Sequence, residues 1–368
     1  MLDVVRLAQE LIRCPSITPH DAGALDIIQN TLEQMGFTCH RLLFENVHNL
    51  YARRGDSSPN FCFLGHTDVV PIGDSASWHH SPFEAVIKDD ILYGRGAVDM
   101  KGAIAAFLGA VSRLTSLTGS ISLLITGDEE GPALYGTRSV LEWLQARKEK
   151  IDFCLVGEPT SVHEIGDTLK IGRRGSLSGI LTVWGVQGHV AYPENFDNPV
   201  PRLMNTLNKL YQTTFDRGSE YFPATHFEVV SIDVGNTAFN VVPAKAEARF
   251  NVRFNDQHSS ASLMDFISVL CQDVAGHHKL DFLVTGEAFL TSSLDFAKKI
   301  QKILKGLSAH LPQLSTTGGT SDARFIHTLC PIVELGLKNI TAHQVDEHVS
   351  IEDLQKLTKL YQAILEAF

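Results

Sequence analysis

Metal-binding side chains follow three short apolar segments of this sequence, in each case close to a glycine. The segments and their side chains are 61–64 with His66 and Asp68, 121–126 with Glu129 and Glu130, and 151–156 with Glu158. A further carboxylate, Asp99, lies between a glycine-flanked turn at 94–96 and a run of small residues at 103–114. Histidine and carboxylate are ligands that zinc and related ions take in catalytic sites. The pattern predicts a metal centre past the carboxyl ends of strands, where α/β proteins place their chemistry.

Asp99 could bridge two metal ions. Each ion would then take one histidine, one carboxylate of its own, the shared aspartate and a water, the four ligands that zinc prefers in an open catalytic site. One histidine is His66, and spacing does not select the second among the sixteen histidines. Histidine ligands favour zinc, cobalt or manganese over magnesium. Two Zn²⁺ ions against three carboxylates would leave the pocket positive, so it could accept an anionic substrate.

Glu129 and Glu130 need separate roles. Adjacent residues of an extended or turning chain point in different directions, so one can bind a metal ion while the other faces the bridging water. A carboxylate there can take a proton from a water whose pKa the ions lower to about 7. Delivering that proton to the leaving group typically contributes ~10²–10⁴-fold to the rate.

Each of these residues has a simpler interpretation when taken alone. A histidine at a strand end is more often a structural residue, and an aspartate before a helix is more often an N-cap. The complete set makes a metal centre the better explanation. The turn at 94–96 is not a nucleotide-binding loop, because the third glycine is misplaced and no Gly-Lys-Ser/Thr follows. The histidine pairs at 79–80 and 277–278 lie in polar stretches, and we expect them to face solvent.

The spacing of apolar residues predicts the elements that position these side chains. Helices are expected at 2–13, 22–35, 103–114, 137–148, 294–307 and 351–368, and strands at 37–44, 50–53, 61–64, 121–126, 151–156 and 331–337. This order fits a mostly parallel sheet with helices on both faces. Strand patterns at 178–184, 227–234 and 246–254, with helices at 200–213 and 260–275, indicate an inserted α+β domain. The predicted domains are 1–174 with 288–368, and 175–287.

Composition excludes several classes of protein. The chain has 368 residues, 44% hydrophobic and 20% charged residues and a net charge of −11. These values predict a two-domain globular protein and argue against nucleic-acid binding, which needs a basic surface. No apolar run is long enough to span a membrane. The six cysteines are scattered, with no CxxC pair, which indicates a reducing compartment and a cytoplasmic protein.

Eight motifs, spread in order over nearly the whole chain, carry a specific resemblance. They are GHTDVVP, YGRGAVDMKG, TGDEEGP, VGEPT, GRRGS, GVQGHVAYP, TTGGTSDARF and AHQVDEHVS. In these motifs the chain resembles the bacterial succinyl-diaminopimelate desuccinylases, of the di-zinc aminoacylase/carboxypeptidase metallopeptidase superfamily. The resemblance implies an α/β fold: a mostly parallel-sheet, di-zinc aminopeptidase-like catalytic domain with an inserted α+β, ferredoxin-like dimerisation domain.

The resemblance also implies a metal centre and a base. The expected ligands are His66, Asp99 and Glu158 for one zinc ion, and Asp99, Glu130 and His343 for the other, with Co²⁺ or Mn²⁺ as substitutes. Glu129 would be the general base. Asp68 would hydrogen-bond to His66 and orient it. The bond between Asp99 and Met100 is expected to be cis.

Substrate contacts and a partner follow from the same resemblance. His189 would reach the partner subunit's site in a homodimer and stabilise the oxyanion. The residues expected to bind the substrate are Arg173, Asn240, Arg253, Gly319, Thr320, Ser321 and Arg324. Arginine suits carboxylates because its planar fork pairs with them bidentately.

The implied reaction is hydrolysis of the succinyl amide of N-succinyl-LL-2,6-diaminopimelate, in the synthesis of lysine and cell-wall precursors. The alternative is a related N-acyl-amino-acid deacylase such as acetylornithine deacetylase. A metal-free binding protein of the same fold is a third reading, against which the complete ligand set argues. Departures from the family pattern, which bear on acyl and amino-acid preference, are at Tyr135, Phe239, Glu287, Ala288 and Ala323.

Overall fold

The structure is a computed structural model that describes every residue except 1, 117, 308 and 309. The chain divides into two compact units. The first comprises Met1–Ile171, Thr291–Ser315 and Ser321–Phe368, and the second comprises Gly172–Leu290 and Thr316–Thr320. Among the described helices, none combines the length and the apolar character needed to cross a membrane.

The first unit is built on an eight-stranded mixed sheet. In sheet order the strands are β1 (Thr38–Phe44), β2 (Val47–Arg54), β6 (Ser120–Thr126), β3 (Asn60–His66), β7 (Phe153–Val156), β18 (Ile332–Glu334), β8 (Thr168–Lys170) and β17 (Gln313–Ser315). Strands β6, β3, β7 and β18 run parallel to one another. Every residue of β3 and β6 is buried, which is typical of parallel strands covered on both faces. The α/β class predicted from the sequence is confirmed.

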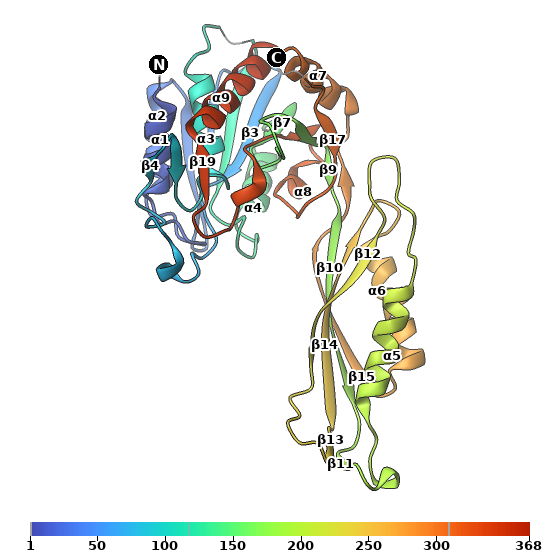
Figure 1. Ribbon diagram of the computed structural model, residues 1–368. Helices are drawn as coiled ribbons and strands as arrows, with labels where there is room; N and C mark the ends of the chain where they lie inside the picture. The colour runs from blue at the N-terminus through green and yellow to red at the C-terminus, as the bar shows by residue number, and fades with distance from the viewer. Residues whose placement is uncertain (1, 117, 308–309) are drawn as a thin grey trace. The chain divides into compact units, whose positions relative to one another are not determined.

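Helices cover this sheet. Those of the first unit are α1 (Val4–Ile12), α2 (Ala24–Gln34), α3 (Lys101–Val111), α4 (Thr137–Ala146), α7 (Leu294–Lys305), α8 (Ala323–Ile326) and α9 (Ile351–Glu366). Helix α3 lies beside α1 and α9 and is buried along its whole length (Figure 1). Small residues allow this packing: a Cβ added at Gly109 would lie 2.2 Å from Cγ2 of Val4.

A second, three-stranded sheet in the first unit positions Asp99. Its strands, in order, are β19 (His348–Ser350), β5 (Ile91–Tyr93) and β4 (Val86–Lys88), all antiparallel. The strand before Asp99 is therefore not part of the main sheet.

The described part of the chain also contains three short 3₁₀ turns. They are η1 (Ser75–Ser77) and η3 (Asn339–Thr341) in the first unit and η2 (Pro193–Asn195) in the second.

The second unit is an α+β structure. Its antiparallel sheet has the order β12 (His226–Asp233), β14 (Lys245–Phe254), β10 (Gly175–Trp184) and β15 (His278–Gly286). Helices α5 (Pro199–Gln212) and α6 (Ser260–Val274) lie on one face of this sheet and enclose its apolar core (Figure 1). The β-α-β-β-α-β chain order is that of ferredoxin-like arrangements. Two short strand pairs complete the unit: β11 (Gly188–His189) with β13 (Val241–Val242), and β9 (Gly172–Arg173) with β16 (Phe289–Leu290).

One strand of the second unit was not expected from the sequence, and one segment is grouped differently. Strand β15 was not predicted, and His278, expected in a polar loop, is its first residue. Its alternating Leu280 and Phe282 pack against the apolar core, and the strand pairs with β10. The segment Thr316–Thr320, expected in the first domain, belongs to the second unit. The hydroxyl of Thr316 donates to the carbonyl of Tyr221 at 2.6 Å, which ties the segment there.

Candidate metal centre

Three neighbouring parallel strands bring candidate ligands to one edge of the main sheet. His66 is the last residue of β3, while Glu130 follows β6 and Glu158 follows β7. In the sheet order β6-β3-β7, β3 is the central strand, so the two carboxylates flank the histidine. His66 is 1% exposed, and its Nε2 lies 3.6 Å from Oε1 of Glu158.

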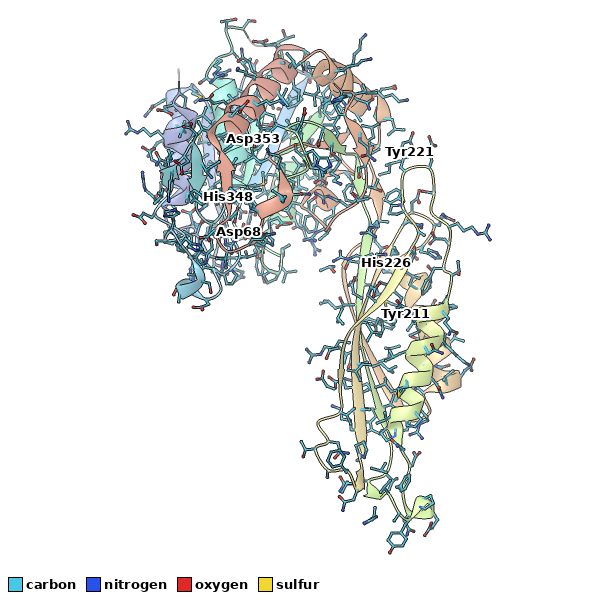
Figure 2. All side chains as sticks on the ribbon, in the orientation of Figure 1. Asp68, Tyr211, Tyr221, His226, His348 and Asp353 are labelled. Carbon is cyan, nitrogen blue, oxygen red and sulfur yellow. The ribbon has the colours of Figure 1, made fainter. Side chains whose placement is uncertain are left out.

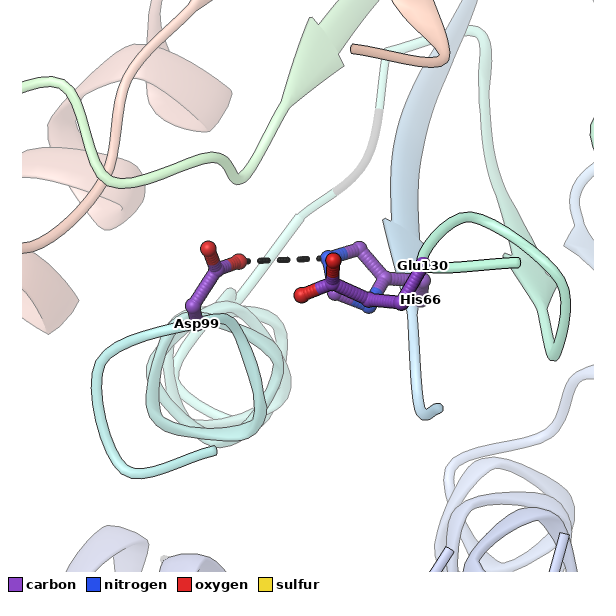
Figure 3. A group of neighbouring side chains, drawn as sticks. All are labelled: His66, Asp99 and Glu130. Carbon is purple, nitrogen blue, oxygen red and sulfur yellow. Dashed lines mark hydrogen bonds and ion pairs between the residues drawn. The ribbon is translucent and has the colours of Figure 1, made fainter. Parts of the chain in front are cut away.

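Asp99 contacts a different histidine with each of its carboxylate oxygens. Its Oδ1 lies 3.2 Å from Nε2 of His66, a contact drawn as a dashed line in Figure 3, and its Oδ2 lies 3.2 Å from Nε2 of His343. Asp99 immediately precedes Met100, the N-cap residue of α3. The predicted cis bond between Asp99 and Met100 is present.

His343 comes to the site from the loop between η3 and β19. Besides Asp99, its Nε2 lies 2.7 Å from Oε1 of Glu130. The pairing of β19 with β5 brings this loop beside the turn that carries Asp99. The structure thus brings together all five predicted ligands, including the histidine that spacing could not select.

Two groups of described residues have ligand atoms within 4.8 Å of one another: His66, Asp99 and Glu130, and His66, Glu129 and Glu158. Figure 3 shows the first group. Glu129 and Glu130, although adjacent, thus approach different carboxylates, which agrees with separate roles. His66 belongs to both groups.

The predicted interaction between Asp68 and His66 differs from the one found. Nδ1 of His66 lies 2.9 Å from the backbone carbonyl of Asp68 and 3.6 Å from its carboxylate. The carboxylate instead accepts from the backbone N–H groups of Glu129, at 3.2 Å, and Glu130, at 3.0 Å. Buried N–H groups need such partners. Asp68, labelled in Figure 2, therefore positions the loop of the two glutamates as well as the histidine ring. Burial raises the pKa of Asp68 to about 6.

The histidines lie in a strongly negative field. Burial lowers the pKa of His66, but its hydrogen bond with Asp99 and the nearby Glu129 outweigh burial and raise that pKa well above the ordinary value. Hydrogen bonds with Asp99 and Glu130 raise the pKa of His343 to about 10. Burial alone would raise the pKa of Asp99, yet contacts with both histidines hold it below its usual value.

This donor set fits metal cations. The field that holds protonated histidines beside these carboxylates would equally attract a divalent ion, to which neutral imidazole and carboxylate are suitable ligands. Burial, followed by the charge of Glu158, raises the pKa of Glu129 well above its ordinary value. A carboxylate in that environment is suited to accept a proton.

The predicted substrate contacts of the second unit lie in three places. At one end, His189 pairs with Val241 between β11 and β13, and the carbonyl of Asn240 accepts from Val190 N–H at 3.1 Å. His189 is exposed. In a second place, Nη1 of Arg173 donates to the carbonyl of Gly319 at 3.0 Å. Thr320 directly follows Gly319 in the chain.

Arg253 occupies the third place, on β14. Its backbone is paired with His226 of β12, which Figure 2 labels. Nη1 of Arg174 lies 3.3 Å from Nδ1 of the same His226. Burial, and to a smaller extent the neighbouring charge of Arg253, lowers the pKa of Arg174. No acidic side chain pairs with Arg174 or Arg253 in the described part of the chain. No sequence motif marks His226, because only the register of β12 with β14 brings it beside Arg253.

The remaining predicted contacts, Ser321 and Arg324, belong to the first unit. The hydroxyl of Ser321 donates to Oε1 of the buried Glu334 at 3.0 Å. The guanidinium of Arg324, at the start of α8, lies 4.7 Å from the ring centroid of Phe325. Neither residue is among the two metal-binding groups described above.

Known proteins resemble this chain over its whole length. The desuccinylase of Ehrlichia canis is 50% identical over 100% of this chain and 98% of its own length. That of Rhodospirillum centenum is 52% identical, over 99% of this chain and 97% of its own. Both are named succinyl-diaminopimelate desuccinylase, so the resemblance inferred from the motifs is confirmed.

Solved structures share the fold. An M20 family metallo-carboxypeptidase from Sulfolobus solfataricus has a TM-score of 0.82 at 19% identity and covers 100% of this chain and 99% of its own. The aminopeptidase PepT from Bacillus cereus has a TM-score of 0.80 at 18% identity, over 99% and 97%. A model of peptidase family M20/M25/M40 matches residues 62–367. The chain belongs to this peptidase family.

Proposed function

We propose that this chain is a metal-dependent amidohydrolase that cleaves N-succinyl-LL-2,6-diaminopimelate into succinate and LL-2,6-diaminopimelate, for lysine and cell-wall precursor synthesis. The observation that carries the proposal is Asp99, whose two oxygens contact different histidines among further carboxylates. The names of relatives that are 50% and 52% identical over nearly the full length support the substrate.

Two metal ions complete the proposed site. His66, Asp99 and Glu158 would hold one, and Asp99, Glu130 and His343 the other. The histidine ligands favour zinc, with cobalt or manganese as substitutes. A related B. subtilis protein of the same fold is described as a dinuclear metal-binding peptidase. When bound, the ions would polarise the amide carbonyl and lower the pKa of the attacking water.

The chain's own residues move the proton. Glu129 would accept it on a carboxylate oxygen from the attacking water and deliver it to the departing amine nitrogen. The carboxyl group would hold the proton until the leaving group takes it. Nδ1 of His189 accepts from Ala191 N–H at 3.0 Å. A neutral His189 then carries its proton on Nε2, where it could donate to the oxyanion from the partner subunit.

The substrate carries carboxylates that need cationic partners. Arg173, Arg253 and Arg324 would bind them, with polar contacts from Asn240, Gly319, Thr320 and Ser321. Arg173 is buried, and the carbonyl of Gly319 orients its guanidinium. Arg253 lies beside Arg174 in a cluster without a described acidic partner. This local positive charge would offset the net charge of −11.

The proposed assembly is a homodimer formed through the inserted domain, 175–287. The edge strand β12 supports this, because Val230 and Ile232 are 65% and 54% exposed on it. Exposed apolar side chains on an edge strand are suited to pairing with another chain. The proposed location is the cytoplasm, in agreement with the six cysteines, all of which are free.

A substrate comparison tests the proposal. Purified protein loaded with zinc would be assayed with N-succinyl-LL-2,6-diaminopimelate and with N-acetylornithine, and kcat/KM compared. We expect preference for the succinyl substrate. Preference for N-acetylornithine would refute the substrate assignment, and absence of any metal-dependent amide hydrolysis would refute the reaction. The Glu129→Ala variant, purified identically, controls for contaminating hydrolases.

A further inference from the structure

A buried ion pair contacts the turn that carries Asp99. Nη1 of Arg95 is 2.8 Å from Oε2 of Glu347, and their side chains are 2% and 0% exposed. Both residues are part of the motifs described above, Arg95 in YGRGAVDMKG and Glu347 in AHQVDEHVS. Neither is a predicted ligand or substrate contact, so the proposed function assigns no role to the pair.

The carboxylate of Glu347 fixes the turn that carries Asp99. Its Oε1 accepts from the backbone N–H groups of Val98, at 2.8 Å, and Asp99, at 3.0 Å. Its Oε2 accepts from the N–H group of Gly96 at 3.1 Å. Together with Arg95, these three N–H groups give the fully buried carboxylate four hydrogen-bond donors. The contacts hold the backbone from Gly96 to Asp99 in one conformation.

Arg95 fixes the loop that carries His343. Its Nη2 donates to the carbonyl of His343 at 3.3 Å, and its Nη1 donates to the carbonyl of Gln344 at 3.2 Å. The same Nη2 lies 3.4 Å from the carbonyl of Pro71. The indole of Trp78 covers the guanidinium, with 5.2 Å between Cζ and the ring centroid. The planar fork of arginine allows one side chain to hold separate segments at once.

The pair therefore holds two of the three proposed ligands of one ion. Asp99 and His343 are on loops outside the main sheet, and the Arg95–Glu347 contacts join those loops to each other. His66 and Glu158, which with Asp99 would hold the other ion, are at the ends of adjacent main-sheet strands, whose register fixes them. Loss of the pair should thus affect the two ions unequally.

We propose that Arg95 and Glu347 are positioning residues for the ion that Asp99, Glu130 and His343 would hold. The inference rests on the ligand sets of the proposed function. Outer partners of metal ligands typically contribute 10- to 100-fold to metal affinity. A merely structural pair would instead lower the stability of the fold and leave the ratio of the two affinities unchanged.

The test measures metal affinity in the full chain, without reference to turnover. Glu347→Gln keeps the shape of the side chain and removes its charge. Stepwise Zn²⁺ titration by calorimetry, and Co²⁺ titration followed by its absorption spectrum, would resolve the two binding steps. We expect the weakened step to lose roughly 10- to 100-fold in affinity, and to be the step that is absent in His343→Ala. In the double variant, the remaining step should lose less affinity than the weakened step loses in Glu347→Gln alone, because only one of its three proposed ligands, Asp99, is positioned by the pair.

Glu149→Gln is the matched control. Glu149 pairs with Arg53 in the same unit, and each side chain is 22% exposed. This variant removes an ion pair that touches no candidate ligand, so both affinities should be unchanged. Thermal unfolding of both variants separates a general loss of stability from a loss of metal affinity. If Glu347→Gln does not fold, Arg95→Lys, which keeps the charge but loses the fork, takes its place with the same expected result.

The proposal is wrong if both binding steps weaken equally, or if neither changes in a folded variant. That result would leave the proposed function intact, since the wild-type protein would still bind two ions and hydrolyse its substrate. Failure of the wild-type protein to bind two ions would instead refute the proposed function, and the positioning role with it.

Discussion

Oδ2 of Asp99 lies 3.2 Å from Nε2 of His343. The other oxygen of the same carboxylate makes its closest described contact with His66, at the same distance. A single carboxylate thereby joins a histidine of the main sheet to a histidine of a distant loop. This divided contact is the geometric basis of the proposal that one aspartate serves two ions, and several measurable consequences follow.

Glu129→Ala should leave the metal content nearly unchanged while turnover falls by ~10²–10⁴-fold, because only the proton transfer is lost. Kinetics of succinyl-amide hydrolysis and metal analysis of the same sample would measure both quantities. Glu142→Ala, at an exposed position of α4, is the control and should keep full activity. Loss of an ion from the Glu129 variant would show that this residue is a ligand instead.

His343→Ala should reduce the metal stoichiometry from two ions to one. His343 contributes the only histidine proposed for its ion, and Asp99 and Glu130 alone form an incomplete set. Dialysed protein analysed for zinc would give the stoichiometry. The control is His277→Ala, since His277 is exposed and belongs to the second unit, which carries none of the five proposed ligands. Retention of two tightly bound ions in His343→Ala would contradict the ligand assignment.

Metal affinity should rise with pH. In the metal-free protein the pKa of His343 is raised to about 10, so at neutral pH this side chain is protonated and must lose a proton to bind a metal ion. Each proton released makes the affinity increase about tenfold per pH unit below that pKa. Titrations at pH 6, 7 and 8, in buffers of different ionisation enthalpy, would count the protons released. Affinity independent of pH would show that His343 binds no ion.

The same shift affects stability of the metal-free protein. The pKa of His343 is higher in the folded than in the unfolded state, so its stabilising contribution is complete below the ordinary histidine pKa. It should be lost as the pH rises through about 10. Thermal unfolding of metal-free wild type and His343→Ala across this range should therefore converge at high pH. A difference that stays constant with pH would contradict the pKa shift.

Arg253→Met should raise KM for the succinyl substrate roughly 10- to 100-fold, the loss expected for a charge-assisted contact. Arg249→Met is the control, because Arg249 is on the same strand but 58% exposed and near Glu247. We expect this variant to behave as wild type. Equal effects of the two substitutions would assign Arg253 a general electrostatic role instead of a substrate contact.

Part of the site could be predicted from the sequence because it depends on local order. Buried apolar runs followed by glycine and a charged side chain mark the ends of β3, β6 and β7. Parallel pairing then places those ends at one edge, so His66, Glu130 and Glu158 were expected together. The motifs added His343, which no periodicity in its own segment indicates.

Other features depend on pairing between distant segments. The contacts of Asp68 with Glu129 and Glu130 could not be read from the sequence, because they depend on how β3 pairs with β6. Asp99 follows a strand of a separate sheet, and only the register of β19 with β5 explains its position. Strand β15 depends likewise on its pairing with β10, a strand about 100 residues earlier in the chain.

The two sheets of the first unit give the metal centre a modular construction. One histidine is anchored to the eight-stranded sheet and the other to the loop beside the three-stranded sheet. Substitutions in the small sheet or its loop would therefore act on Asp99 and His343, whereas His66 and Glu158 depend on the large sheet, so variation in the small sheet would retune one ion more than the other.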